Sequence, residues 1–582
     1  MRRKNLFLSL ICSVLVAVTM ISFTVYSLVS TNPNKGQNDN GGSNVSIVGD
    51  SNVADPGDEI VIDENINELR DGSADLPYVL FSASNFVDML STYGGQTQPQ
   101  RTVVKEQVLV EDETGALVPK YDEEGNAVFQ NKLDEDGNLV YEYVLDEQGN
   151  KVYVPYCFEL GKNIDFAGVD VEPLFNNGEK FIGTIDGKGF KLKNISINVT
   201  TEGFEDDYSY TVGDHRVAHI ALLGDVEGAT VKDLTIEAMN VAVAEDVYTF
   251  ISNGQYDANK GFYKEIIVGS VAANAVDTTF ENVKVEATID AFAYAVYTNN
   301  KAAGFNALGG LVAVAEDVTV KGSTIDVEIS ANAGGNYFVG GVAAYAYSVD
   351  VEDTFVDVAV KANYAQRLSI AGMFVKAENV DVAGVNVEFD LTEKSATEAE
   401  RAEYVSGLGE TAHNNNLGKA AGVVVFLTAN DDTQKSVFND VSIVANVDYD
   451  CIYAGVIMDV DTTDKTNVEL VKLNDVDVNS NVNVLVAYGY ARQLVAATVT
   501  FTESTTAANI TLMGNTKLDK YIVTGSVEQS YSATLFTYKD NYRYLTVDIG
   551  TLRFKITTAI AEKLGSTDNL RIKNNTYGAV EY

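Results

Sequence analysis

The chain has 582 residues, with 83 acidic residues against 41 Lys and Arg, a formal net charge of −42 and 46% hydrophobic residues. That apolar content excludes a wholly disordered chain and is enough for a large core. The charge argues against nucleic-acid binding, because phosphate backbones are held by basic patches. It argues equally against docking on anionic lipid.

The N-terminus predicts export. Basic residues at positions 2–4 precede an uncharged apolar segment from residue 6 to residue 30. Such a start is typical of a signal peptide, and about 25 uncharged residues also suffice to span a bilayer. Residues 1–30 are therefore interpreted as a signal peptide or a membrane anchor, and both alternatives stay open. In either case the chain that follows lies outside the cell and contacts a membrane only through this segment.

Residues 31–75 are predicted to be a flexible linker. The stretch from residue 31 to residue 44 is polar and rich in Asn and Gly, a composition that cannot bury enough surface to fold.

Residues 101–155 contain a twelve-residue repeat. The sequence Asp-x-x-Gly-Asn recurs at residues 122–126, 134–138 and 146–150, with alternating apolar residues between the copies. Asp at the start of a turn and Gly in a left-handed position are typical of hairpins. We therefore predict a β-meander inserted into the chain.

The same repeat suggests calcium at Asp134-x-Asp136-x-Asn138. A helix-loop-helix calcium loop needs Gly at its sixth position and Glu at its twelfth, and those positions hold Leu139 and Leu145. The motif therefore fails, and a plain turn is the favoured interpretation. Residues 101–160 carry 14 acidic and five basic side chains, which could attract cations or a basic partner.

Residues 156–490 carry two short motifs that recur in pairs. The first is a Gly within apolar residues, centred on Gly183, Gly224, Gly269, Gly310, Gly341, Gly372, Gly422 and Gly455. The second is apolar-x-(Asn/Asp/Gly)-x-x-apolar, centred on Asn194, Asp233, Asn282, Gly322, Asp353, Gly384, Asp440 and Asp475. Eight paired copies indicate a repeat architecture.

The two motifs predict stacked coils. Runs rich in Val and Ile suit strands, and Asn, Asp and Gly tolerate the left-handed backbone that turns a corner. One coil cannot bury its apolar face alone, but coils paired in parallel about 4.8 Å apart build a continuous core. We expect the eight glycines to lie above one another in a column.

The opening motifs resemble a known family. The segments 156–168 and 181–197, which read Tyr-Cys-Phe-Glu-Leu-Gly-Lys-Asn-Ile-Asp-Phe-Ala-Gly and Phe-Ile-Gly-Thr-Ile-Asp-Gly-Lys-Gly-Phe-Lys-Leu-Lys-Asn-Ile-Ser-Ile, are similar to the first coils of bacterial surface β-helix proteins of the adhesin-like, GLUG-repeat type. Residues 77–90 resemble the strand and helix that precede those coils. The resemblance implies an all-β, right-handed parallel β-helix with residues 76–100 as its N-terminal cap. Many such proteins are exported adhesins.

Beyond residue 490 the repeat loosens. Residues 491–582 remain strand-like, as at 544–549 and 552–556, and are predicted to form terminal coils and a cap, with a short helix at 557–564. A solenoid end needs such a cover because it exposes unpaired strand edges.

No residue is assigned to catalysis, a cofactor or a metal. His215 and His219 are four apart in a presumed surface loop without a third ligand, and His413 is isolated. Asp165 and Asp186 lie in strand or corner positions and are expected to be structural. Loosely held Ca²⁺ is left open.

Cys157 and Cys451 fall in distant coils, too far apart for a disulfide, which needs Cα atoms within about 7 Å. We expect two free, buried thiols.

The 31 tyrosines suggest a binding surface. Tyr337, Tyr345, Tyr347 and Tyr364 cluster around one coil, where they could stack on sugars or simply pack in the sheet. We expect a non-enzymatic protein at the cell surface, either secreted or anchored, that acts in adhesion or surface structure by binding an extracellular glycan or protein. The alternatives are a polysaccharide lyase or hydrolase on the same scaffold and a subunit of an extracellular sheet or filament.

Overall fold

The computed structural model divides into two units, residues 1–46 and 47–582. It describes residues 57–58, 60–111, 117–121, 126–135, 140–200, 210–212, 215–244, 264–293, 297–298, 301–302, 304–333, 337–362, 368–393, 418–428, 435–449, 451–461, 471–484, 486–488, 491–493, 499–501, 508–512, 523–525, 543–547, 552–556, 570–573 and 578–581. The predicted signal or anchor segment, His413, Tyr364 and the predicted helix 557–564 lie outside these residues. Within them, no helix combines the length and the apolar character needed to cross a bilayer.

The N-terminal cap joins the stack through one strand and one helix. Strand β1 (Tyr78–Leu80) pairs in parallel with β10 (Cys157–Leu160). Helix α2 (Ala83–Tyr93) begins at Ser82, whose Oγ accepts a hydrogen bond from the backbone N of Asn85 and so satisfies an otherwise unpaired donor. The helix buries Ala83, Phe86 and Leu90 and thereby covers the first coil.

The end of the predicted linker is packed rather than flexible. A short 3₁₀ helix, η1 (Ile66–Leu69), lies beside β1. The Asn67 side chain accepts from the backbone N of Val79 and donates to its O, at 2.8 and 2.9 Å. Arg70 pairs with Glu159 at 2.8 Å. The two Asn67 bonds occupy the outer edge of β1 and the Arg70 ion pair reaches β10, so the linker prediction is wrong for this part of residues 31–75.

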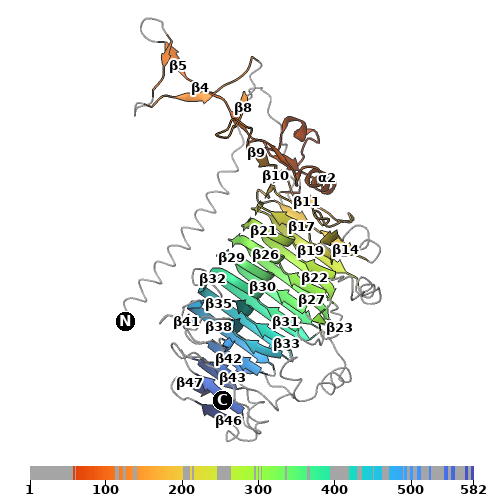
Figure 1. The fold of residues 1–582 in the computed structure, drawn as a ribbon, viewed down its shortest axis with the longest axis vertical. Helices are drawn as coiled ribbons and strands as arrows, with labels where there is room; N and C mark the ends of the chain where they lie inside the picture. The colour runs from red at the N-terminus through yellow and green to blue at the C-terminus, as the bar shows by residue number, and fades with distance from the viewer. Residues whose placement is uncertain are drawn as a thin grey trace, which may run out of the picture. The chain divides into compact units, whose positions relative to one another are not determined.

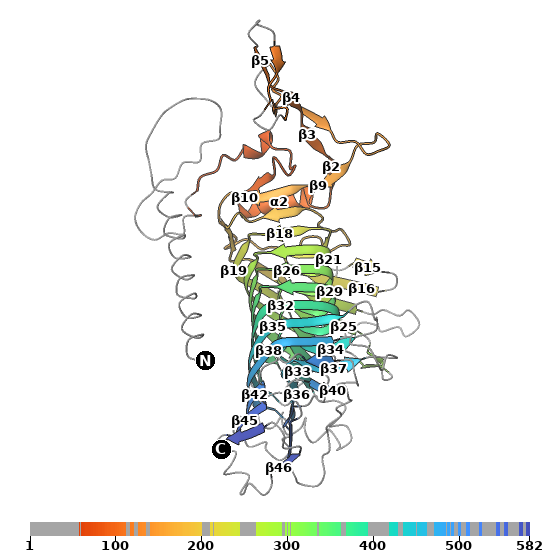
Figure 2. The ribbon, with the colours of Figure 1, turned by 90° about the vertical axis from the view of Figure 1, so that its left-hand side faces the viewer.

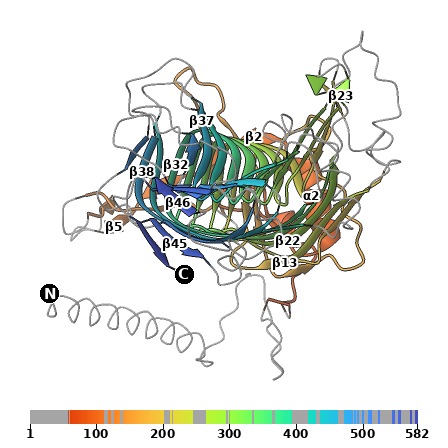
Figure 3. The same cartoon turned by 90° about the horizontal axis from the view of Figure 1, so that it is seen from below.

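Parallel pairing joins successive coils in two sheets, and the predicted β-helix is confirmed (Figures 1 and 2). The larger sheet contains β1, β10, β11 (Ile164–Asp165), β12 (Thr184–Asp186), β13 (Lys191–Lys193), β14 (Ser196–Val199), β17 (Leu223–Glu227), β18 (Thr230–Lys232), β19 (Thr235–Val243), β21 (Ala272–Glu281), β22 (Lys284–Ala293), β26 (Val312–Lys321), β27 (Thr324–Ala333), β29 (Ala343–Glu352), β30 (Phe355–Ala362), β32 (Phe374–Glu393), β34 (Val424–Thr428), β35 (Ser436–Asp448), β37 (Ile457–Asp461), β38 (Val471–Asn483), β40 (Ala491–Gln493), β41 (Val499–Phe501), β42 (Ala508–Leu512), β45 (Leu552–Ile556) and β47 (Gly578–Glu581). The smaller sheet contains β15 (Tyr210–Val212), β16 (His215–Ile220), β20 (Lys264–Val268), β25 (Gly304–Gly309), β28 (Tyr337–Gly340), β31 (Leu368–Ala371), β33 (Gly418–Ala421), β36 (Cys451–Ala454), β39 (Val486–Tyr488), β43 (Val523–Gly525), β44 (Arg543–Val547) and β46 (Leu570–Lys573). A hairpin of β23 (Tyr297–Thr298) and β24 (Lys301–Ala302) stands apart. Seen along the stack, strands of successive coils lie behind one another (Figure 3).

The second motif marks a corner of each coil, as predicted. Seven of its eight central residues occupy the same register position with positive φ, from 47° at Asp353 to 65° at Gly384. The exception is Asn194, which has a positive φ but aligns with Ala238 at a different corner. In its coil the equivalent position belongs to Gly187, next to Asp186. The sequence match at Asn194 was therefore displaced by one corner.

The glycine column is present in only part of the stack. Gly310, Gly341, Gly372, Gly422 and Gly455 lie above one another, and a Cβ on any of the first four would meet the next glycine's carbonyl O at 2.0–2.2 Å.

The expected alignment is wrong for the first three glycines. Ser270 stands at this corner in its own coil and donates a hydrogen bond to Gly310 O, while Gly269 aligns with Gly309. Gly224 lies within β17, and Gly183 lies immediately before β12, so neither stands in the column.

The core is one continuous cluster of buried apolar side chains from Leu80 to Val484. Neither Cys157 nor Cys451 forms a disulfide, as predicted. Cys451 is buried, whereas Cys157 is only half-buried, which corrects the expectation that both are buried. Burial still raises the pKa of the Cys157 thiol.

The insert is not a simple meander. Its outgoing strands are β2 (Thr97–Pro99), β3 (Arg101–Val103), β4 (Lys105–Gln107) and β5 (Leu109–Glu111), and its returning strands are β6 (Leu117–Pro119), β7 (Phe129–Asn131), β8 (Tyr141–Tyr143) and β9 (Tyr153–Pro155). The pairs are β2–β9, β3–β8, β4–β7 and β5–β6, all antiparallel. The insert is thus one long ribbon whose returning chain makes a side hairpin in each repeat. We call residues 97–155 the arm.

Candidate functional site

A second layer of side chains lies where each coil passes from the smaller sheet to the larger one. Successive side chains of a strand point to opposite faces. Ala218 and Ile220 of β16 therefore join the main core, while His219 and Ala221 face the other way. Two small apolar clusters, separate from the main core, occupy this opposite face.

Two rows of aligned residues define this surface, which we call the corner face. From the smaller sheet come His219, Ile267, Ala307, Phe338, Ser369, Lys419 and Ile452. From the larger sheet come Asp225, Asn274, Val314, Tyr345, Lys376, Phe426 and Asp459.

Aromatic rings and an ammonium group meet in the middle of the corner face. The rings of Phe338 and Tyr345 meet edge to face, with centroids 5.6 Å apart. Lys376 Nζ lies 5.3 Å from each of these two centroids, within the range of a cation–π contact. The Tyr347 ring lies 6.4 Å from that of Tyr345. We call Phe338, Tyr345, Tyr347 and Lys376 the Lys376 cluster.

The cluster is electrostatically unusual for so acidic a chain. None of the ion pairs among the described residues includes Lys376, and burial lowers the pKa of its ammonium group. Tyr345 is 6% exposed, whereas Tyr347 is 37% exposed. Burial, followed by the charges of Glu378 and Glu316, raises the pKa of Tyr347. The cluster therefore offers one accessible ring beside a poorly solvated cation.

A second lysine on the corner face is already neutralised. Lys419 Nζ lies 2.9 Å from Asp459 Oδ2 and 4.4 Å from the centroid of the Phe426 ring. The Lys419–Asp459 ion pair lies between the Lys376 cluster and the later coils. Asp459 neutralises the charge of Lys419.

At the other end of the corner face, His219 is buried rather than in a surface loop, so that prediction is wrong. Its Nδ1 lies 2.6 Å from Asp225 Oδ1, which also accepts from Asn274 Nδ2 at 3.1 Å. The described residues contain no group of three or more His, Cys, Asp or Glu that could hold a metal. The pair satisfies two buried polar groups, a structural role.

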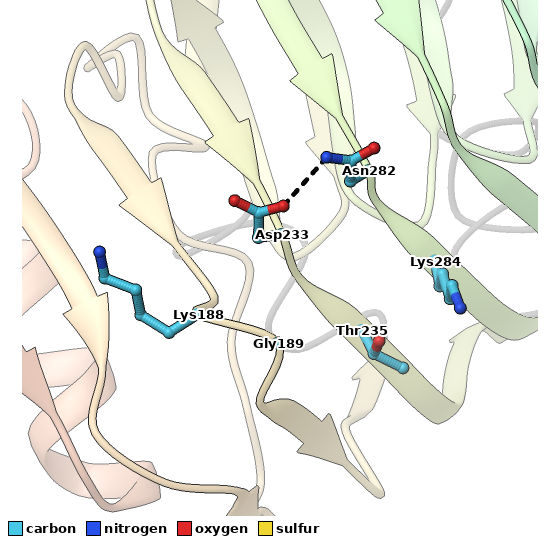
Figure 4. A pocket seen from close by; sticks show the side chains of 6 residues that line it. All are labelled: Lys188, Gly189, Asp233, Thr235, Asn282 and Lys284. Carbon is cyan, nitrogen blue, oxygen red and sulfur yellow. Dashed lines mark hydrogen bonds between the residues drawn. The ribbon is translucent and has the colours of Figure 1, made fainter. Parts of the chain in front are cut away.

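A shallow depression lies at the corner that Asp233 and Asn282 of the second motif form. It is lined by Lys188, Gly189, Asp233, Thr235, Asn282 and Lys284. Figure 4 shows the two lysine side chains on opposite sides of it, while Asn282 Nδ2 donates to Asp233 Oδ1 at 3.0 Å. Lys188 pairs with Asp186 at 3.0 Å, and this bond raises the pKa of the lysine. Lys188, Asp233 and Asn282 are therefore engaged with neighbouring side chains rather than directed at a ligand.

The structure brings together two of the four tyrosines named from the sequence. Tyr345 and Tyr347 share a face of β29, Tyr337 lies in β28, and Tyr364 is outside the described residues. Sequence reasoning missed Phe338 and Lys376, which come from other strands. The signal that could have found Lys376 is its position four residues after Gly372, which matches the position of Tyr345 four residues after Gly341.

Asp165 has partners within its own region of the stack. It accepts hydrogen bonds from Asn194 Nδ2 at 2.8 Å and from the backbone N of Ala167 at 2.9 Å. These bonds, that of Asn194 first, lower the pKa of Asp165. Asp186 likewise binds Lys188 and Lys232.

Comparisons with known proteins give little. No family model and no curated protein matches the sequence. Among solved structures, a chain of an IgA1 protease is similar, with a TM-score of 0.32 and 13% identity over 82% of this chain and 29% of that chain. That neighbour is named a protease, and the expectation that this chain is not an enzyme is therefore withdrawn. So distant a likeness assigns no activity, and the resemblance to GLUG-repeat proteins stays a prediction.

Proposed function

We propose that the chain is an exported surface protein of the GLUG-repeat type that binds an extracellular glycan on its corner face and so acts in adhesion. The apolar N-terminal segment supports export, and the stacked coils supply a rigid scaffold. The observation that carries the binding site is the placement of Lys376 over Phe338 and Tyr345, next to the accessible Tyr347 ring.

The chemistry of the cluster favours a sugar that carries a carboxylate. An exposed aromatic ring can pack against the apolar face of a sugar. The ammonium group of Lys376 has lost part of its water through burial and forms no ion pair among the described residues, so an incoming carboxylate would supply a charge-assisted hydrogen bond. Both groups lie on rigid strands, which limits the entropy lost on binding.

The test is a glycan array probed with the full exported chain, with and without calcium. Tyr347→Ala and Lys376→Met should each weaken binding to carboxylated glycans at least tenfold, because each removes one of two contacts. Tyr347→Phe should retain most of the affinity because it retains the ring. The matched control is Lys472→Met, an exposed lysine of β38 away from the corner face.

Equal binding by Lys376→Met, Tyr347→Ala and Lys472→Met would rule out this site. A preference for neutral glycans that survives Lys376→Met would retain the tyrosine and remove the lysine from the proposal.

A second function is favoured by the half-buried position of Lys376 beside the rings of Phe338 and Tyr345, where burial lowers its pKa, since perturbed titratable groups cluster at catalytic sites. A neutral lysine amine can take the proton from C5 of a uronate. The C–H electron pair then forms the C4–C5 double bond, the C4–O bond breaks, and the leaving oxygen takes a proton from water. This reaction is a β-elimination, which cleaves the polysaccharide without hydrolysis.

The pH dependence separates the two functions. Binding by the ammonium form is strongest below the pKa of Lys376, whereas catalysis by the amine is strongest above it. Incubation with uronate polymers, monitored by the ultraviolet absorbance of the unsaturated product, detects lysis. Turnover that Lys376→Met abolishes would establish the lyase, and binding without turnover at any pH would exclude it.

A further inference from the structure

The arm has an architecture that exposes apolar side chains at regular intervals. Three branch points each join three backbone segments through a closed ring of hydrogen bonds. At the middle one, Val104 N donates to Val140 O, Val140 N to Lys132 O and Lys132 N to Val104 O, at 2.8–2.9 Å. The same ring forms one repeat earlier and one repeat later, around Val108 and Gln100.

The branch points explain the twelve-residue repeat. The outgoing strand advances four residues per branch, and the returning chain advances twelve. Eight of these twelve lead from one hydrogen-bonded residue of a ring to the next and contain the Asp-x-x-Gly-Asn sequence. In the last hairpin, Asp146 Oδ1 accepts from the backbone N of Gln148 and Asn150, both at 2.9 Å. Among the described residues of the arm, half-buried valines beside these hydrogen-bonded rings form a small apolar core.

The repeat also places apolar side chains in water. Of the 14 large apolar side chains that are exposed in the described residues, nine belong to the arm, namely Leu109, Val110, Leu117, Tyr121, Phe129, Leu133, Tyr143, Leu145 and Tyr153. Tyr121, Leu133 and Leu145 occupy the same point of successive repeats, with 58%, 52% and 55% of their surface exposed. Folding of the arm does not bury these side chains, so packing does not explain them. Contiguous exposed apolar surface marks interaction sites.

The backbone of the arm is equally open. Each of its four ladders has two strands, and none of them pairs with a strand of the coils among the described residues. Open strand edges accept a further strand through main-chain hydrogen bonds. Residues 101–160 carry 14 acidic and five basic side chains. This excess of negative charge repels a second copy of this chain and attracts a basic partner protein.

We propose that the arm is a docking surface for a basic partner protein, which adds an extended segment of alternating apolar and cationic residues to the ribbon. The apolar residues of that segment cover Tyr121, Leu133 and Leu145, and its Lys or Arg side chains are attracted by the excess of acidic side chains in residues 101–160. This site is independent of the corner face.

The test uses the full exported chain and three synthetic twelve-residue peptides as probes. One peptide alternates Lys with Val or Tyr, one replaces Lys with Glu, and one replaces Val and Tyr with Ser while keeping Lys. Binding is measured by isothermal titration calorimetry for the unsubstituted chain and for the triple variant Tyr121→Ser, Leu133→Ser and Leu145→Ser. The matched control is Val61→Ser, Val169→Ser and Val444→Ser, three exposed apolar residues elsewhere.

Of the three peptides, the one that alternates Lys with Val or Tyr should bind the unsubstituted chain most tightly. Its affinity should be at least tenfold lower for the arm variant and unchanged for the control variant, and it should fall as salt is added. Equal binding to all three proteins would show non-specific attraction to an acidic chain and overturn the proposal. So would equal binding of the Glu peptide. Sedimentation of the chain alone gives a further check, since dimers that the arm variant abolishes would assign the arm to a second copy instead.

Discussion

Stacking in register repeats each side chain at the spacing of the coils, and this places like charges together. Asp326, Asp357 and Glu388 are aligned on three successive strands. Burial, followed by the negative charges of Asp326, Glu388 and Asp390, raises the pKa of Asp357. Repulsion within this acidic ladder of Asp326, Asp357 and Glu388 therefore lowers the stability of the fold at neutral pH.

Asp357→Asn should stabilise the fold at neutral pH. A carboxyl group whose pKa is raised by folding binds its proton more tightly in the native state, so its charge costs stability above the native pKa. Like charges opposite one another on paired strands cost about 0.2–1 kcal/mol, and the gain should lie in that range. Thermal unfolding should show a higher Tm for the variant at pH 7 and no difference once the pH falls below the unfolded pKa.

Asp165→Asn is the opposite case and the control. Its pKa is lowered by the hydrogen bond from Asn194 and by that from Ala167 N. It therefore contributes stability above its unfolded pKa, which is lost as the pH falls through the native pKa. Asp165→Asn should lower the Tm at pH 7. A lower Tm for Asp357→Asn as well would contradict the account of the acidic ladder.

At the scale of a single coil, the corner between the two sheets depends on close backbone approach. Gly341 has no room for a side chain, because a Cβ would lie 2.0 Å from Gly372 O and 2.9 Å from Val358 Cγ1. The obstacle is backbone on one side and a buried side chain on the other, so neither can give way cheaply.

Gly341→Ala should destabilise the stack by about 1–3 kcal/mol, the usual cost of overpacking a core. Gly418→Ala is the matched control, since a Cβ there meets nothing closer than 3.5 Å, at Tyr449. Chemical denaturation of the two variants measures the difference. Equal midpoints would show that the corner can open without cost.

The β-helix was predictable because its corners use residues with an intrinsic backbone preference. Asp233, Asn282 and Asp353 turn the chain with positive φ, and that preference is readable from residue type. The same tolerance misled the alignment at Asn194, which has the expected conformation at another corner. The glycine motif was less specific, because an apolar-Gly-apolar pattern arises wherever two strands approach closely.

The corner face was less predictable, because its residues are far apart in the sequence. Lys376 and Tyr345 meet only because β29 and β32 pair with Tyr345 opposite Lys376. The loops between coils vary in length, so in the sequence only the equal four-residue distance of Tyr345 from Gly341 and of Lys376 from Gly372 relates the two. The branches of the arm were unpredictable for a similar reason. The sequence indicates the turns, but only the strand pairing shows that the outgoing segment advances four residues per branch and the returning segment twelve.

For the whole molecule, the formal net charge of −42 opposes the approach of the anionic glycan that the Lys376 cluster is proposed to bind. The two effects act over different distances. Repulsion by the whole chain is long-range and is screened by salt, with a Debye length of about 30 Å at 0.01 M and about 8 Å at 0.15 M. The contact with the half-buried Lys376 is short-range and is screened much less.

Binding of a carboxylated glycan should therefore strengthen several-fold as salt rises from about 0.01 to 0.15 M, because screening removes the repulsion before it weakens the contact. Titration calorimetry at several NaCl concentrations measures the trend, and the neutral form of the same glycan should show little change. Calcium should act in the same direction at lower concentration by neutralising surface carboxylates. A steady fall in affinity with salt would mean that exposed cations rather than the Lys376 cluster hold the ligand.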